Sequence, residues 1–383
     1  MRRGSRSGTV RPLIRAALDS IEPYEAGKSI EEVERELGVS RAVKLASNEG
    51  PFGPFPIARQ MLATQSYELN RYPDSGAYRL RTVLAERLGV DIDEVAHGAG
   101  ADGLISHLSL ALLEPGDEVV FGWPSFTSYM LSTVKMGAIP KPVPLRDDRY
   151  DLEAMLAQIG SKTKIVYICN PNNPTGTMTG REELDAYLER VPGHVLTVID
   201  QAYFEYIEEP DYPDAIEEYF KRGKRVAVLR SFSKIYGLAG LRVGYAVASK
   251  EICAAIAKVR PAFDVSSTAQ VGAIASLTGD DADAELERRR SYNAVAVAEL
   301  GRILRAFGLE TVGPAVANFL YVDLGTDSRP FFESLLEQGV VVRPLHSFGA
   351  PTAIRVTAGT AEEHALLRQA LQVVRPSGHS SAD

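Results

Sequence analysis

The sequence predicts an α/β protein in which a mostly parallel sheet is flanked by helices and followed by a smaller α+β domain. Short runs rich in β-branched residues alternate with helical patterns through the middle of the chain, as in sheets built from strand–helix–strand units. After about residue 275, the pattern changes to one long charged helix, short strands and a closing helix. A chain of 383 residues also exceeds one ordinary core, so two domains are expected.

The expected strands of the large sheet are apolar almost throughout and do not alternate with polar residues. This pattern is typical of strands that are buried on both faces. Residues 180–191 between them are predicted to be a helix, because glutamates and arginines surround an apolar stripe. The strands are expected at residues 118–122, 164–170, 195–200, 225–232 and 242–249.

The C-terminal part is predicted to hold a helix over 282–308 and a closing helix over 361–374. Short strands are expected between them, at 317–324, 339–345 and 353–359, and the segment around 20–50 is expected to pack beside this part. The domain prediction is therefore an N-terminal arm with part of the small domain (1–50), a large domain (51–275) and a small C-terminal domain (276–383).

Composition narrows the class of protein. A net charge of −8 argues against a nucleic-acid partner, because such proteins usually carry a basic excess. No apolar run is long enough to span a bilayer, so no membrane partner is expected. Cys169 and Cys253 do not form a C-x-x-C or a metal-like spacing. We therefore expect a cytoplasmic protein without a disulfide scaffold or a bound metal.

The stretch GAGADG at 98–103 matches the dinucleotide pattern G-x-G-x-x-G. Such a site needs a strand before the glycines and an acidic residue at the end of the next strand. The preceding run, DIDEVAH, has few apolar residues, and Glu118 begins the next predicted strand where it should end it. A nicotinamide enzyme is thus a weak alternative. The glycines still predict a turn that leads into a helix. The N-terminus of that helix is either a binding site for a phosphate or only the start of the helix.

Polar residues follow three of the predicted strands, where parallel sheets bind their ligands. The strand 164–170 runs into PNNPTGT, the strand 195–200 ends at Asp200, and the strand 225–232 runs into SFSKIYGLAGLR. A lysine beside serines and an arginine, with a carboxylate on the neighbouring strand, suits pyridoxal phosphate. That cofactor needs a Schiff-base lysine and an acid paired with its pyridinium nitrogen.

These motifs, in this order, resemble the aspartate-aminotransferase superfamily of fold-type I pyridoxal-phosphate enzymes. Within it, the chain resembles histidinol-phosphate aminotransferases and their aromatic-aminotransferase relatives, from about residues 23–38 to 354–364. The resemblance implies an aspartate-aminotransferase-like large domain with a seven-stranded type of sheet. It also implies a homodimer with shared active sites and pyridoxal 5′-phosphate as the cofactor.

The resemblance further implies roles for individual residues. Lys234 bonds covalently to the cofactor and moves the proton at the substrate Cα. Asp200 pairs with the ring nitrogen, and Tyr203 donates a hydrogen bond to the phenolic oxygen. The remaining cofactor contacts are Asn173 at the phenolic oxygen, Phe126 stacked on the ring, Ser231, Ser233, Arg242, Gly100, Ala101 and Asp102 at the phosphate, and Tyr72 reaching the phosphate from the partner subunit.

On the substrate side, the resemblance implies that Arg355 binds a carboxylate or phosphate with help from Arg343. Tyr24 contacts the substrate phosphate and Asn48 borders the cleft. Plain structural explanations exist for these positions as well. The arginines could lie on a solvated sheet face, the tyrosines and Phe126 could be packing residues, Asn173 a turn former and Asp200 a helix cap.

The predicted function is transamination of histidinol phosphate with 2-oxoglutarate or glutamate as the second substrate, in histidine biosynthesis. An aromatic amino acid aminotransferase is the alternative within the same chemistry. A ligand-binding regulator of this fold is the alternative from another class, but no basic helix-turn-helix stretch is present. Gly50, Gly103 and Gln201 depart from the residues usual in the family, which leaves the substrate less defined than the cofactor.

Overall fold

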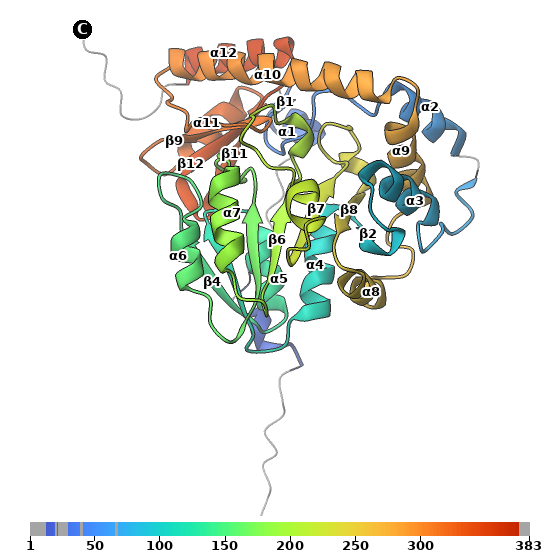
Figure 1. Cartoon of the computed structure of the whole chain (residues 1–383). Coiled ribbons are helices and arrows are strands. Elements are labelled where there is room, and N and C mark those ends of the chain that lie inside the picture. Colours follow the sequence, from blue (N-terminus) through green and yellow to red (C-terminus); the bar gives the residue numbers. More distant parts are fainter. Residues whose placement is uncertain (1–12, 20, 22–29, 39–40, 66–67, 375–383) are drawn as a thin grey trace, which may run out of the picture.

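A seven-stranded sheet forms the centre of the protein in the computed structural model, which describes residues 13–19, 21, 30–38, 41–65 and 68–374. The strand β8 runs antiparallel to both of its neighbours, whereas the other neighbouring pairs are parallel. This confirms the predicted α/β fold with a mostly parallel sheet (Figure 1). In spatial order the strands are β2 (Val95–Gly98), β8 (Gly244–Val247), β7 (Val226–Ser231), β6 (Leu196–Asp200), β5 (Thr163–Cys169), β3 (Glu118–Trp123) and β4 (Ile139–Pro144).

The five predicted strands are present, and β2 and β4 are additional. In β4, the prolines occupy every second position, so the N–H groups that they lack all belong on one side of the strand. Because β4 is an edge strand, that side is the open edge, where proline is tolerated.

The run before Gly98 is a strand, which corrects the expectation from its few apolar residues. It is short because Asp91 caps a single turn, η3 (Ile92–Glu94), directly before β2. Glu118 is not placed to bind the ribose of a dinucleotide, as the sequence predicted. It begins β3, where a ribose-binding acid would end the strand, and it pairs there with Lys141 at 2.8 Å. In addition, β3 is separated from β2 by four other strands of the sheet. The arrangement is therefore not that of a dinucleotide site.

Helices cover both faces of the large sheet. On one face, α4 (Gly100–Leu112) packs against α5 (Thr127–Lys135) and α8 (Lys250–Val259). On the other face, α6 (Leu152–Ala157) packs against α7 (Arg181–Arg190), which lies in front of the sheet in Figure 1. Coverage from both sides explains why the central strands are almost continuously apolar.

Three helices pack together beside the β2 edge of the sheet, at the right of Figure 1. The helix α9 contacts both of the others and belongs to the same apolar core as the sheet. The three helices are α2 (Pro56–Gln65), α3 (Tyr78–Leu88) and α9 (Ser267–Thr278).

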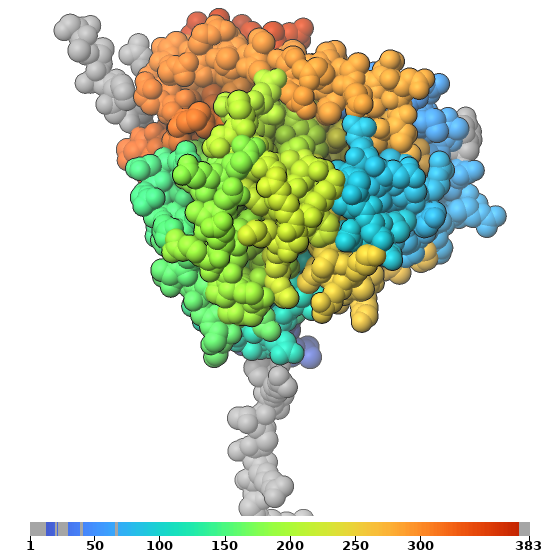
Figure 2. All heavy atoms as spheres, viewed as in Figure 1, coloured from blue at the N-terminus to red at the C-terminus, as the bar shows by residue number. Residues whose placement is uncertain are grey.

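The C-terminal part forms a separate layer with its own core. A three-stranded antiparallel sheet in the order β11-β12-β9 is covered by helices, and α10 runs across the top of the molecule in Figures 1 and 2. The elements are α10 (Ala282–Ala306), β9 (Phe319–Asp323), α11 (Arg329–Glu337), β10 (Val340–Val341), β11 (Arg343–Leu345), β12 (Ala350–Thr357) and α12 (Ala361–Val373).

The N-terminal segment joins this second core. The strand β1 (Val43–Lys44) pairs with β10, and Val33 of α1 (Ile30–Leu37) packs with Val341. The predicted packing of this segment beside the C-terminal part is therefore observed. The domain limits at 50/51 and 275/276 stay predictions. Among the helices that the structure describes, none combines the length and apolar character needed to cross a membrane.

Candidate active site

A cavity of about 370 Å³ lies where the strands of the large sheet end. The carboxyl ends of β5 and β6 are adjacent, because Cys169 pairs with Asp200. Ser231 at the end of β7 pairs with Gly244, and Gly98 at the end of β2 pairs with the same residue. The register therefore brings the asparagine turn, Asp200, the lysine segment and the GAGADG turn to one edge of the sheet.

The second core supplies the opposite side of the cavity. Arg343 and Arg355 are paired across β11 and β12, and both side chains are buried. Together the two sides bring most of the predicted residues into one site. The predicted residues that line the cavity are Asn48, Ala101, Asp102, Phe126, Asn173, Asp200, Tyr203, Ser231, Ser233, Lys234, Arg242, Arg343 and Arg355.

Lys234 follows β7 and extends into this cavity. Its Nζ donates to the carbonyl oxygen of Ser47 at 3.4 Å and lies 5.3 Å from the centre of the Tyr203 ring. Burial, and then the positive charge of Arg355, lower the pKa of Lys234 to about 7. Near neutral pH, much of this lysine is therefore an uncharged amine, the form that attacks a carbonyl carbon.

We expect the acylation rate of Lys234 by an amine-selective reagent to be half-maximal near pH 7, because the reactive form appears as the proton leaves. Lys250 is the matched control, since its exposed ammonium pairs with Asp91 and its pKa is raised. Peptide mass spectrometry across a pH series measures both sites in one sample. A Lys234 rate that keeps climbing into the alkaline range together with that of Lys250 contradicts the assignment.

Asp200 is buried at the end of β6 and accepts two hydrogen bonds. One comes from the hydroxyl of Tyr129 at 2.8 Å and the other from the backbone N–H of Ala202 at 3.1 Å. Burial raises the pKa of Asp200 to about 6, while these hydrogen bonds lower it. The carboxylate is therefore ionised above that pH and is held in one orientation.

Tyr203 and Asn173 both present polar atoms to the cavity and are held from behind. The Tyr203 hydroxyl accepts from Nδ2 of Asn48 at 2.9 Å, which leaves its own proton to donate. Burial raises the pKa of Tyr203, so the hydroxyl keeps that proton. Oδ1 of Asn173 accepts a hydrogen bond from Arg355, so the Asn173 amide nitrogen is the atom left to donate.

Asn48 is itself fixed by the end of β12. Its backbone N–H donates to Oγ1 of Thr357 at 3.0 Å, and its side-chain oxygen accepts from the same hydroxyl at 3.1 Å. Because Asn48 comes from the segment after β1 and Tyr203 from the segment after β6, their contact joins the two cores across the cavity.

Arg242 and the start of α4 form a cradle for an anion. The Arg242 guanidinium donates to Oγ of Ser233 at 3.2 Å and to two backbone carbonyls. Gly100 suits this position because its φ is +76°, a conformation that L side chains rarely adopt, and because Nη2 of Arg242 lies 2.6 Å from where a Cβ would be. The close approach places a cation, serine hydroxyls and the first N–H groups of α4 beside one another, which are donors suited to a phosphate.

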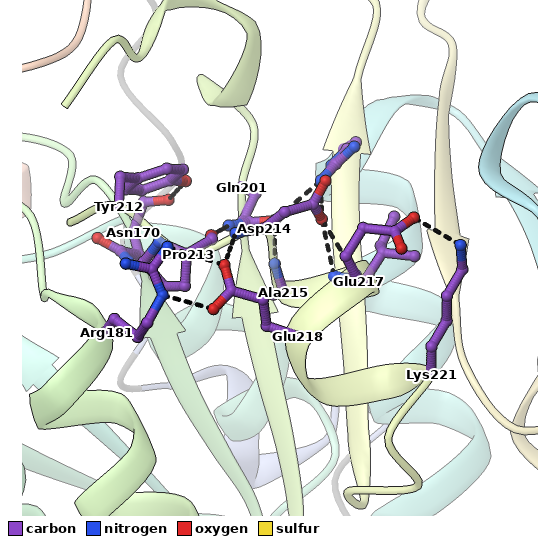
Figure 3. Close-up of polar contacts among 12 residues, drawn as sticks. Asn170, Arg181, Gln201, Tyr212, Pro213, Asp214, Ala215, Glu217, Glu218 and Lys221 are labelled. Carbon is purple, nitrogen blue, oxygen red and sulfur yellow. Dashed lines mark hydrogen bonds and ion pairs between the residues drawn. The ribbon is translucent and has the colours of Figure 1, made fainter. Parts of the chain in front are cut away.

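The Gln201 departure is explained by a polar network around its buried side chain, and Figure 3 shows its contacts with Pro213 and Ala215. The Gln201 side chain donates to the carbonyl of Pro213 at 2.8 Å and accepts from the backbone N–H of Ala215 at 3.3 Å. It also accepts from Arg230 at 3.3 Å, and Asp214 balances the charge of that arginine at 2.7 Å. An acid at position 201 is thus not required to neutralise the buried cation.

Gly50 and Gly103 depart from the family pattern next to the cavity. A Cβ at Gly50 would lie 3.0 Å from the Lys234 carbonyl oxygen, so a larger residue would press on the lysine segment. A Cβ at Gly103 would lie 3.2 Å from the Cβ of Ala99. In this chain, Gly50 lets the segment after β1 pack closely against the lysine segment, and Gly103 lets the first turn of α4 pack closely against Ala99.

Three predicted site residues are not among those lining the cavity. Gly100 lies just behind it, in contact with Arg242. Tyr72 is 83% exposed and stacks on Phe263 with ring centres 4.5 Å apart, which fits a residue predicted to act in a partner subunit. Tyr24 falls outside the described residues.

Several residues in or next to the cavity carried no sequence signal. Tyr129 hydrogen-bonds Asp200 from inside α5, and Glu49 lines the cavity while pairing with Lys44 at 3.1 Å. Phe348 lies against both arginines, with its ring centre 5.7 Å from Arg343 and 5.5 Å from Arg355. Tyr129 is remote in sequence from Asp200, and no local motif marks Glu49 or Phe348, so only the three-dimensional contacts reveal these residues.

The functional groups that line the cavity are an amine, carboxylates, hydroxyls and guanidinium groups. Within the described ranges, no group of three or more histidine, cysteine, aspartate or glutamate side chains is arranged to hold a metal ion. A reactive amine, a buried carboxylate and an anion cradle that share one cavity, on this doubly covered sheet, define the aminotransferase class of site.

Comparison with known proteins agrees with this class. Residues 40–374 match the family model for class I and II aminotransferases, and the chain belongs to this family. It is 43% identical over 364 residues to a histidinol-phosphate aminotransferase from Moorella thermoacetica, covering 95% of this chain and 93% of that protein. The resemblance inferred from the motifs is thereby confirmed.

Solved structures give the same result for the fold. The histidinol-phosphate aminotransferase from Sinorhizobium meliloti, solved in complex with pyridoxal-5′-phosphate, superposes with a TM-score of 0.84 at 29% identity, covering 96% of this chain and 98% of that one. A double mutant of Thermus thermophilus aspartate aminotransferase gives a TM-score of 0.80 at 24% identity, covering 94% and 98%. The second likeness confirms the aspartate-aminotransferase-like fold.

Proposed function

We propose that this protein is a pyridoxal-phosphate-dependent aminotransferase that exchanges an amino group between histidinol phosphate and 2-oxoglutarate, in histidine biosynthesis. The observation that carries the proposal is the single cavity shared by Lys234, Asp200, the Arg242 cradle and the Arg343–Arg355 pair. The names of the relatives from Moorella thermoacetica and Sinorhizobium meliloti support the choice of substrate.

The residues of the cavity fit the cofactor at three points. Lys234 offers an amine for its aldehyde, Asp200 a carboxylate for its ring nitrogen, and Arg242 with the neighbouring serines a seat for its phosphate. Asn173 and Tyr203 each retain a donor for the phenolic oxygen. Phe126 lines the same cavity and offers an aromatic face to the ring. When bound, the cofactor supplies an electron sink for the carbanion formed at the substrate Cα.

The chain supplies the groups that bind, orient and move protons. Lys234, with its pKa lowered to about 7, can take the proton from the substrate Cα and return it. Asp200, ionised above about pH 6, holds a negative charge opposite the ring nitrogen. The Tyr203 hydroxyl, whose pKa is raised by burial, stays a donor throughout this range.

Two adjacent buried arginines favour a strongly anionic substrate. Arg343 and Arg355 are direct cross-strand partners and both line the cavity, so their guanidinium groups can donate to one anion bound there. A phosphate monoester carries up to two negative charges and accepts two-pronged hydrogen bonds from guanidinium groups. Glutamate and 2-oxoglutarate can use the same pair through a carboxylate, which a two-substrate transaminase requires.

Arg355→Ala is expected to raise KM for histidinol phosphate by about 100-fold, the loss of a charged two-pronged hydrogen bond. The affinity for the cofactor should stay close to that of the wild type, because the phosphate cradle is built around Arg242. Steady-state kinetics and a spectroscopic cofactor titration measure the two effects separately. Loss of the cofactor with no change in KM would show that Arg355 binds the cofactor and not the substrate.

An amino-donor panel tests the proposed substrate. Histidinol phosphate, phenylalanine and tyrosine are each supplied with 2-oxoglutarate, and glutamate formation is followed under identical conditions. The proposal predicts that kcat/KM is highest for histidinol phosphate. A higher value for either aromatic amino acid would assign the chain to aromatic amino acid transamination.

We also propose a cytoplasmic homodimer with shared active sites. The exposed Tyr72–Phe263 stack supports a partner subunit, since such an aromatic pair leaves apolar area in water until it is covered. Cys169 and Cys253 are both free and buried, which fits a reducing compartment. Light scattering should give twice the chain mass of 41.6 kDa, and a monomer at working concentration would contradict the dimer.

A further inference from the structure

The contact between Tyr129 and Asp200 has no sequence motif behind it. The Tyr129 hydroxyl donates to Oδ2 of Asp200 at 2.8 Å, and the Tyr129 side chain is fully buried in α5. Oδ1 of Asp200 accepts from the Ala202 N–H, so each carboxylate oxygen has one protein donor. The carboxylate can therefore turn only by breaking a hydrogen bond in a site shielded from water.

The surroundings of Tyr129 fix where its hydroxyl lies. Its ring stacks on Tyr167 of β5 with centres 4.4 Å apart and an interplanar angle of 11°. It also meets the edge of Phe126 at 5.8 Å and Phe121 at 6.2 Å. A buried ring held on several sides has one available rotamer, so the direction of its hydroxyl is set by packing.

The chemistry of a phenol suits this position. Burial raises the pKa of Tyr129 well above its ordinary value, so the group remains a neutral donor. A hydrogen bond to the ionised carboxylate favours that charged form and opposes the effect of burial. A neutral donor also leaves the negative charge of Asp200 uncancelled, whereas a cation at this place would compete for it.

We propose that Tyr129 is a positioning residue that keeps the Asp200 carboxylate ionised and directed into the cavity, where it meets the protonated ring nitrogen of the cofactor. This inference rests on the proposed function. It extends that function by naming the group behind Asp200. It also gives α5 two tasks, since Phe126 at its N-terminal end lines the cavity and Tyr129 lies one turn further along.

Tyr129→Phe tests the proposal, because it removes one oxygen and keeps the ring. The affinity of the apoprotein for pyridoxal phosphate is measured by absorbance titration across a pH series. We expect affinity to fall by about 10-fold or more, the loss of a hydrogen bond to a charged group. The loss should be larger at about pH 6 than at about pH 8, because without its donor Asp200 takes up a proton at higher pH.

Tyr167→Phe is the matched control. Tyr167 is also buried and stacks on Tyr129, but neither hydrogen bond of Asp200 comes from it. The affinity of the Tyr167→Phe variant for pyridoxal phosphate should follow that of the wild type across the pH series. A Tyr129→Phe profile that matches the wild type, or that drops equally at every pH, overturns the positioning role. If the wild-type protein itself fails to bind pyridoxal phosphate, the proposed function fails first, so the two failures are distinguishable.

Discussion

Replacing Lys234 with alanine is expected to lower kcat by about 10⁴-fold or more, because one amine both bonds to the cofactor and moves the substrate proton. The cavity keeps its other donors, including Arg242, Ser233 and Asn173, so the cofactor should still bind without a covalent bond. Single-turnover kinetics with a preloaded variant separate this chemical defect from a loss of cofactor.

Lys250→Ala is the control for that experiment, since Lys250 lies on the surface and pairs with Asp91. Its turnover should equal that of the wild type. Retention of more than a small fraction of wild-type kcat in Lys234→Ala would show that another group moves the proton. Lys44, which pairs with Glu49 at the edge of the cavity, would then be the next residue to replace.

Arg230→Ala is expected to lower the free energy of unfolding by about 4 kcal/mol, the loss expected when one partner of a buried ion pair is removed. The Arg230 side chain is 4% exposed, contacts Asp214 at 2.7 Å and lies 3.4 Å above the Phe204 ring. Its removal also leaves Glu205 buried with less positive charge nearby, and burial already raises the pKa of Glu205 to about 7. Urea denaturation of wild type and variant measures the difference.

The control here is Arg41→Ala, whose partner in an exposed ion pair is Glu362. An exposed pair contributes only about 1 kcal/mol or less, so this variant should be close to the wild type. Equal effects of the two replacements would show that the polar network in Figure 3 does not stabilise the segment after β6. The network anchors the same segment that carries Asp200 and Tyr203, so the Arg230 variant should also bind the cofactor more weakly.

The sequence was sufficient to predict the half of the site that lies on the large sheet. Parallel strands buried on both faces leave continuous apolar runs, and their ligand-binding ends follow directly in the chain. Asp200 ends such a run, Asn173 and Lys234 each stand a few residues beyond one, and the three residues meet in one cavity. Five of the seven strands of the large sheet were predicted from such runs.

The missed features depend on contacts between distant residues. Tyr129 lies 71 residues from Asp200, and Arg355 lies 182 residues from Asn173, so no local pattern could indicate either contact. The strand β2 was missed because four buried residues after an acidic turn show little periodicity. The alternating prolines of β4 resemble a loop until its place at the sheet edge is known.

The fold adds a further reason against the dinucleotide interpretation of GAGADG, which was already the weak alternative from the sequence. Gly100 has a φ of +76°, which favours glycine, and a Cβ at Gly244 of β8 would lie 2.8 Å from the Gly100 carbonyl carbon, so Gly100 and Gly244 let the two segments approach closely. They bring the first turn of α4 next to the guanidinium and the serine hydroxyls. The phosphate seat stays a prediction, which this arrangement of donors supports, whereas the dinucleotide interpretation needed a neighbouring strand that this sheet places elsewhere.

The identity of the lysine that bonds to the cofactor can be measured directly. The purified protein is loaded with pyridoxal phosphate, its visible absorbance is recorded, and borohydride is added to make the lysine–cofactor bond permanent. Peptide mass spectrometry then locates the label. We predict a single labelled peptide that carries the cofactor on Lys234, the amine with the lowered pKa in the segment after β7. A colourless protein, or a label on any other lysine, would contradict the proposed active site.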